Sequence, residues 1–138
     1  MFEKYKTQIE EQITRLLVDE GVEPVAIQWS IIPFSGQWGL ATSFFQIAAQ
    51  EARSGKKVNV PQRAIELAEI TARKIQLSAD FEKCEAVKGY LNLYFDSKRF
   101  STMVVDQVLN EKDKFGSAPD THERVMVEFS QPNTHKSF

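Results

Sequence analysis

The sequence predicts an α+β fold in which helices pack on one face of a small antiparallel β-sheet. In its longer segments, apolar residues recur every three or four positions, which is the spacing of an amphipathic helix. In its shorter segments they recur at every second position, the spacing of a half-buried strand. Two short segments follow each other directly within residues 81–96, and helices and strands do not alternate regularly, which favours antiparallel pairing over a parallel sheet.

The spacing of apolar residues predicts four helices. Gly21 is the expected stop of the first helix, because glycine is common just after helix C-termini. Asn59 is the expected N-terminal cap of the third helix and Ser97 that of the fourth, since short polar side chains accept hydrogen bonds from the first free backbone amides. The predicted helices cover residues 2–20, about 41–54, about 60–75 and about 98–108.

Four segments are predicted to be strands. Residues 25–31 alternate between apolar and polar, with Val25 and Ile31 at the two ends of the apolar set. Residues 81–96 form two short strands broken at Lys88-Gly89, a turn-forming pair. Residues 124–130 predict a last, buried strand after a turn-rich connector. This connector is the expected boundary with whatever lies downstream.

Length, charge and cysteine content narrow the class of protein. The 138 residues fit one domain, and 42% hydrophobic with 26% charged residues is ordinary for a globular chain. The net charge of −2 argues against a protein that coats DNA, but not against local RNA recognition through base stacking and base edges. The single cysteine, Cys84, has no internal disulfide partner. A cytoplasmic setting is expected, with no membrane-spanning run and no signal peptide.

The strand within KGYLNLYF holds the first candidate site. Alternate side chains of a strand point to opposite faces, so Tyr90, Asn92 and Tyr94 share one face while Leu91 and Leu93 face the core. An aromatic ring stacks on a nucleobase, and an asparagine amide offers a donor and an acceptor that match an adenine edge. Recognition of an unstacked base is one interpretation. The other is that the tyrosines serve only the strand, for which aromatic residues are favoured.

The C-terminal stretch holds the second candidate site. A predicted strand containing Glu128 runs into a loop with Asn133 and Lys136, an arrangement typical of ligand-binding loops in open α/β sheets. The alternative is a solvated polar tail. No Ser-His-Asp order, paired catalytic carboxylates, metal-ligand spacing or complete nucleotide motif appears in the sequence.

The stretch VMVEFSQPNTHKSF, residues 125–138, resembles a segment of the arginyl-tRNA synthetases. That family reads Val-Glu-Phe-Ser-x-Pro-Asn-x-x-Lys immediately before the His-x-Gly-His signature of its class I catalytic domain, so we expect the chain to stop just short of that signature. Other parts of the chain resemble the family more weakly: GQWGLATSF with Gln37 in place of the usual Asp, PQRAIELAEITARKI, and GYLN in place of Gly-Phe-Ile-Asn. The positions that match the C-terminal pattern are Val127, Glu128, Phe129, Ser130, Pro132, Asn133 and Lys136.

The resemblance implies a division of the chain and a role for its first part. Residues 1–114 are expected to form the N-terminal additional domain, 115–123 a connector, and 124–138 the first strand and loop of a Rossmann-type catalytic domain. The additional domain of this family recognises the D-loop and elbow of arginine tRNA. Tyr90 is then the expected stacking partner of a D-loop adenine, and Asn92 the reader of its edge.

In a complete enzyme of this family, the resemblance places Glu128 and Asn133 on arginine and Lys136 on ATP or the adenylate, with Mg²⁺ assisting. The chain itself is expected to be inactive and to bind no ATP, arginine, metal or DNA. Two other classes stay open. One is a free-standing protein-interaction domain that uses the Tyr90 and Tyr94 face, and the other is a small complete enzyme, disfavoured because no catalytic set is visible.

Overall fold

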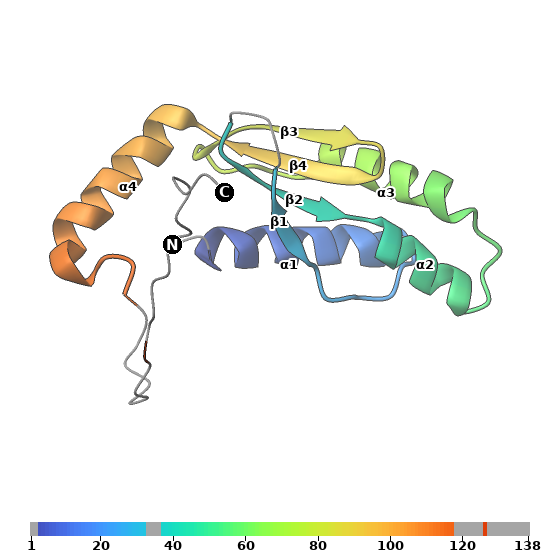
Figure 1. Ribbon diagram of the computed structural model, residues 1–138. Helices are drawn as coiled ribbons and strands as arrows, with labels where there is room; N and C mark the ends of the chain where they lie inside the picture. The colour runs from blue at the N-terminus through green and yellow to red at the C-terminus, as the bar shows by residue number, and fades with distance from the viewer. Residues whose placement is uncertain (1–2, 33–36, 118–125, 127–138) are drawn as a thin grey trace, which may run out of the picture.

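The computed structural model describes residues 3–32, 37–117 and 126 of the chain. Within these residues, helices lie against a four-stranded antiparallel sheet, so the predicted α+β fold is confirmed (Figure 1). The helices are α1 (Glu3–Asp19), α2 (Phe45–Arg53), α3 (Val60–Lys74) and α4 (Ser97–Glu111), with a short 3₁₀ helix, η1 (Lys112–Lys114), after α4. The strands are β1 (Trp29–Ile31), β2 (Gly39–Ser43), β3 (Phe81–Val87) and β4 (Tyr90–Phe95).

The strands lie in the order β1-β2-β4-β3, and every neighbouring pair is antiparallel. β3 and β4 form the predicted hairpin. Its turn is Lys88-Gly89, both with positive φ, the backbone that a tight two-residue hairpin turn requires. β4 is thereby placed in the interior of the sheet, between β2 and β3.

Strand β2 was not predicted, and the helix expected to begin at residue 41 begins only at Phe45. The reason is burial on both faces: Leu40, Ala41 and Thr42 are all buried, so this strand shows no alternation of apolar and polar residues. Gly39 lets β2 approach β4 closely, because a Cβ atom there would overlap the carbonyl of Leu93 and the side chain of Ile32.

The first predicted strand is shorter than expected. Regular pairing covers only Trp29–Ile31 rather than residues 25–31. The alternation before it still has its predicted effect, since Val25, Ile27 and Trp29 all pack against the core. Ile31 does not follow them and is 76% exposed, because β1 is the edge strand and nothing among the described residues covers its end.

The helix ends follow the predicted capping chemistry with one correction. Asn59 caps α3, its Oδ1 accepting a hydrogen bond from the backbone N–H of Gln62 at 3.2 Å. The cap of α4 is Asp96 and not Ser97, since the Asp96 carboxylate accepts from the N–H of Arg99 at 2.9 Å. A carboxylate at this position also interacts favourably with the positive end of the helix dipole.

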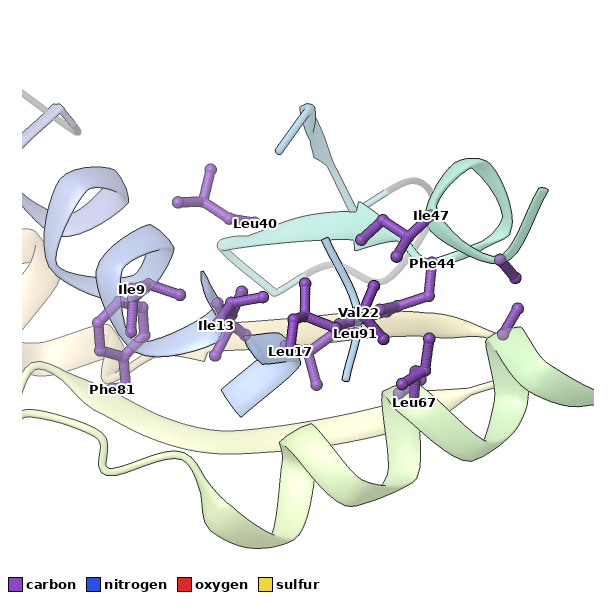
Figure 2. Packing of buried hydrophobic residues seen from close by; sticks show 14 of the residues in the cluster. Ile9, Ile13, Leu17, Val22, Leu40, Phe44, Ile47, Leu67, Phe81 and Leu91 are labelled. Atoms are coloured by element: carbon purple, nitrogen blue, oxygen red, sulfur yellow. The ribbon is translucent and has the colours of Figure 1, made fainter. Parts of the chain in front are cut away.

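One hydrophobic core joins the sheet to helices α1, α2 and α3 and to the start of α4. Ile13 and Leu17 of α1 and Leu67 of α3 meet Leu91 of β4 on the inner face of the sheet (Figure 2). Burying a side chain of this size contributes roughly 1.5–3 kcal/mol each. The helical layer therefore covers one face of the sheet, and no described helix covers the other face, which we call the open face.

Helix α4 lies apart from this layer, running away from the sheet (Figure 1). Its first turns are anchored by Phe100, which is buried, and by Met103, but Val105 and Leu109 further along are 54% and 65% exposed. In the described ranges, no helix is long and apolar enough to cross a membrane. The predicted domain boundaries depend largely on residues 118–125 and 127–138, which lie outside the described residues.

Candidate nucleic-acid interface

The open face of the sheet is built from rows of side chains on neighbouring strands. Residues directly opposite each other in antiparallel strands point to the same face. Asn92 of β4 lies opposite Ala41 of β2 on one side and Glu85 of β3 on the other. The next row along β4 pairs Tyr90 with Ser43 and with Val87.

A groove of about 600 Å³ runs along this face. On β1 and β2 it is lined by small side chains, Ser30 and Ala41, which leave room beside the larger residues of β4. The Ser30 hydroxyl donates to the backbone carbonyl of Ala41 at 3.3 Å, so its own polar group is occupied locally. The groove is lined by Ser30, Ile31, Ile32, Ala41, Val87, Tyr90, Asn92 and Tyr94. The two residues predicted to recognise a base, Tyr90 and Asn92, are therefore brought together on one cavity wall.

Tyr90 combines exposure with a fixed position. Its side chain is 45% exposed, and its ring packs at 60° to that of Phe45, with 5.7 Å between the centroids. Gly89 immediately before it carries φ +86°, and a Cβ atom there would lie 2.8 Å from the Phe45 ring. The glycine is thus required both by the turn and by the aromatic residue that supports Tyr90.

Asn92 is the polar group of the groove. It is half-buried, and among the described residues its side-chain amide makes no hydrogen bond. An amide carries two donor hydrogens and an acceptor oxygen. The Asn92 amide lies beside the exposed ring of Tyr90, and its donor hydrogens and acceptor oxygen are available to a ligand.

Tyr94 shares the face but is not exposed, which corrects one expectation. It is only 7% exposed and packs with Ile32 and Ala41 in a small cluster of its own. The Lys83 Nζ atom lies 4.7 Å from the centroid of its ring. The expectation that Tyr90 and Tyr94 together form an exposed contact surface is therefore wrong for Tyr94. Its apolar partners are Ala41 of β2 and Ile32 just after β1, and the sequence alone did not reveal them.

The charges on this face are paired. Lys83 Nζ donates to Glu85 Oε1 at 2.8 Å, and this hydrogen bond is the main reason why the pKa of Lys83 is raised. Next along β3, burial raises the pKa of the Cys84 thiol to about 12, so it is no nucleophile at neutral pH. Within the described part of the chain, no group of three or more His, Cys, Asp or Glu side chains is arranged to hold a metal ion.

A second groove, of about 330 Å³, adjoins the first at Ser30 and Ile31. Its most exposed aromatic residue is Trp38, at 63%, whose ring stacks on Phe100 with 5.5 Å between centroids and 24° between planes. Trp38 was not singled out in the sequence. No signal there distinguishes an exposed tryptophan in a turn from a buried one.

The second predicted site is the C-terminal loop. Glu128, Asn133 and Lys136 all lie outside the described residues. Their contacts with arginine and ATP stay predictions.

Comparison with known proteins shows which proteins the chain is similar to. No protein-family model matches the chain. The arginine–tRNA ligase of Clostridium acetobutylicum is 33% identical over 97% of the chain, and arginine–tRNA ligase 1 of Bacillus cereus is 28% identical over the same share. The chain is a homologue of one segment of the arginine–tRNA ligases. It spans 22% of the length of each of these two ligases.

The fold of the chain agrees with a solved structure. Thermus thermophilus arginyl-tRNA synthetase matches 72% of the chain with a TM-score of 0.53 and 21% sequence identity, over 15% of the synthetase chain. At that identity the likeness supports the fold alone. The resemblance inferred from the residues at the C-terminus is confirmed by the match to the clostridial ligase, which extends over 97% of the chain.

Proposed function

We propose that the chain is the tRNA-recognition part of an arginine–tRNA ligase, and that the open face of its sheet binds an unpaired base in the D-loop of arginine tRNA. The observation that carries this proposal is the Asn92 amide. It has no hydrogen-bond partner among the described residues and lines the same groove as the exposed ring of Tyr90. A polar group left available beside an exposed aromatic ring is suited to a ligand that is flat, apolar on its faces and polar at its edge.

A nucleobase has those properties. Stacking of a base on an aromatic side chain is worth about 1–3 kcal/mol, and it tolerates any base. Edge contacts supply the selection, and an asparagine that bonds adenine at two atoms adds a comparable amount. Such contacts are available only where bases are unpaired, as in loops. In an RNA duplex the major groove is too deep and narrow for side chains to read the base edges, and the shallow minor groove is recognised mostly by its shape.

In a complete ligase, binding at this face would contribute by positioning the tRNA. The arginine carboxylate first attacks the α-phosphate of ATP and releases pyrophosphate, and a hydroxyl at the 3′ end of the tRNA then takes the arginyl group and releases AMP. We propose Glu128 and Asn133 for contacts with arginine and Lys136 for contacts with ATP, with Mg²⁺ as the expected metal. Holding the tRNA by its D-loop brings its 3′ end into register for that second step. The proposed setting is the cytoplasm, where translation takes place.

The described residues include neither Glu128 nor Asn133 nor Lys136. We expect the 138-residue chain alone to bind arginine too weakly for calorimetry to detect. Measurable heat of arginine binding at millimolar concentrations would contradict this part of the proposal.

A mutant cycle between protein and RNA tests the proposed contact. Wild-type protein and Asn92→Ala are titrated, at low salt, with arginine tRNA transcripts that carry adenine or uracil at the D-loop position. Wild type should prefer adenine by about tenfold or more, and Asn92→Ala should lose that preference. Low salt is needed because phosphate contacts, which supply much of the affinity, are weakened by salt.

Asn110→Ala is the matched control, since Asn110 is an exposed asparagine on α4, away from the groove. It should bind both transcripts as wild type does. An Asn92→Ala variant that binds both transcripts as tightly as wild type does, or an adenine preference that survives in Asn92→Ala, would refute the assignment of Asn92.

A further inference from the structure

We infer that Glu85 fixes the orientation of the Asn92 amide and so makes the groove select adenine and cytosine, whose amino group lies beside a ring-nitrogen acceptor, over guanine and uracil, whose carbonyl lies beside a ring N–H donor. This inference rests on the proposed function, because it concerns how the same groove chooses among bases. It adds a positioning residue, on a different strand, that nothing in the sequence pointed to.

The sheet register gives Asn92 two unlike neighbours. On the β2 side the residue directly opposite is Ala41, a methyl group that lines the groove. On the β3 side it is Glu85, a carboxylate. Directly opposite residues in an antiparallel pair have Cβ atoms about 4.5–5.5 Å apart, which is within reach of both side chains. The amide therefore lies between an apolar wall and a negative charge.

The carboxylate is held in place on the open face. Its Oε1 accepts from Lys83 Nζ at 2.8 Å, and the same ammonium lies 4.7 Å from the centroid of the Tyr94 ring. Within the described residues, Glu85 Oε2 makes no hydrogen bond. One oxygen is thus tethered, and the other is available to the neighbouring amide.

An isolated asparagine amide does not discriminate between two classes of base. Adenine and cytosine present an exocyclic amino donor beside a ring-nitrogen acceptor, whereas guanine and uracil present a carbonyl acceptor beside a ring N–H donor. Turning the amide by 180° exchanges its donor and acceptor, so it fits either order equally well. Stacking on Tyr90 adds no choice, since every base has a face to stack.

Glu85 removes this ambiguity because a carboxylate is a hydrogen-bond acceptor only. It attracts the NH₂ group of Asn92 toward β3 and leaves the amide oxygen on the side of Ala41 and the groove. The groove then presents an acceptor, which matches the amino group of adenine or cytosine. A guanine or uracil carbonyl in the same place would bring two acceptors together.

The test uses Glu85→Gln, which keeps the size of the side chain but removes its charge and gives it a donor. Four arginine tRNA transcripts that differ only in the D-loop base are titrated with wild type and with this variant. Wild type should bind the adenine and cytosine transcripts more tightly than the guanine and uracil ones. In Glu85→Gln that preference should fall by about tenfold, because the amide can now turn to fit either class.

Glu82→Gln is the matched control. It removes the same charge from the same strand, at an exposed residue beside the bulge that follows Phe81 and outside the pair with Asn92. Both variants should bind all four transcripts somewhat more tightly, since each loses a negative charge near the RNA. Only Glu85→Gln should change the ratio between the classes.

The outcomes separate the inference from the proposed function. If wild type prefers adenine and cytosine, Asn92→Ala loses that preference and Glu85→Gln keeps it, the proposed function stands and the inference is overturned. A wild-type preference for guanine and uracil also overturns it. If wild type shows no preference but Asn92→Ala binds all four transcripts more weakly, the inference alone is overturned. If wild type shows no preference and Asn92→Ala binds all four transcripts as tightly as wild type does, the proposed function fails and the inference with it. A melting temperature of Glu85→Gln within a few degrees of wild type shows that the change does not act through unfolding.

Discussion

The ring of Tyr90 packs against the ring of Phe45 at 60°, with 5.7 Å between the two centroids. Tyr90 begins the strand that lines the groove, and Phe45 begins helix α2. A second contact joins the same segments, since the backbone N–H of Phe44 donates to the carbonyl of Gly89 at 3.0 Å. The helical layer therefore positions the aromatic residue of the opposite face, and the position of Tyr90 depends on residues that do not line the groove.

The first prediction separates the ring of Tyr90 from its hydroxyl. Tyr90→Ala should weaken tRNA binding by about 1–3 kcal/mol, or roughly 5- to 150-fold, because the stacking surface is lost. Tyr90→Phe should bind within about twofold of wild type, since the ring stays. Filter binding at low salt measures both. A Phe variant as weak as the Ala variant would show that the hydroxyl, and not stacking, makes the contact.

The second prediction concerns the turn before Tyr90. Gly89→Ala should destabilise the protein by about 2–4 kcal/mol, because a methyl group there combines a positive φ with a 2.8 Å approach to Phe45. Gly55→Ala is the control: its φ is +94°, but no atom lies within 4 Å of the added Cβ, so it should cost only about 1 kcal/mol. Urea unfolding gives both values. Equal losses of unfolding free energy in Gly89→Ala and Gly55→Ala would mean that the Phe45 ring moves aside without cost.

The third prediction concerns a buried ion pair between α2 and α3. Glu51 is 5% exposed and accepts from Arg63 Nε at 2.9 Å and Nη2 at 3.4 Å, which raises the pKa of Arg63. Glu51→Ala should lower the free energy of unfolding by about 3 kcal/mol, because it leaves a largely buried guanidinium with its main partner gone. Glu66→Ala removes the other carboxylate on Arg63, which is 56% exposed, and should cost less than about 1 kcal/mol. A small loss in both variants would contradict a structural role for the pair.

The fourth prediction follows from the Cys84 thiol. Burial raises its pKa from 9.0 to about 12, so the folded protein keeps a proton that the unfolded chain loses above pH 9. This contribution to stability is present below pH 9 and is lost as the pH rises from 9 toward 12. The difference in unfolding free energy between wild type and Cys84→Ala should therefore shift against wild type between pH 8.5 and 11. In native protein at pH 8, iodoacetamide should react with Cys84 far more slowly than in urea, and equal rates would refute the burial.

The sequence was sufficient for those elements in which one face is buried and the other is not. The α1 and α3 stripes, the 81–95 hairpin and the Asn59 cap are all as predicted. It was insufficient for β2, because a strand buried on both faces carries no alternation and its apolar residues run on into those of α2. Without β2, one of the two interior strands, the sequence predicts the right fold class but not the strand order of the sheet.

The candidate site was predictable only along one strand. Alternation in β4 was enough to put Tyr90 and Asn92 on one face, and the register confirms that they share it. What lies beside them on neighbouring strands depends on pairing that is remote in sequence. For this reason the groove wall at Ala41, the burial of Tyr94 and the carboxylate of Glu85 appear only in the folded protein.

The most direct test of the central claim is to observe the Asn92 side chain while RNA binds. In ¹⁵N-labelled protein, the two side-chain N–H signals of Asn92 can be assigned by comparison with Asn92→Ala and followed by NMR during titration with arginine tRNA. If the open face binds a D-loop base, these signals and the backbone amides of Val87 and Tyr90 shift as the RNA saturates, and a transcript without the D-loop adenine moves the Asn92 pair less. Saturating RNA that leaves the Asn92 signals in place, while shifting amides of the helical layer, would show that tRNA binds elsewhere.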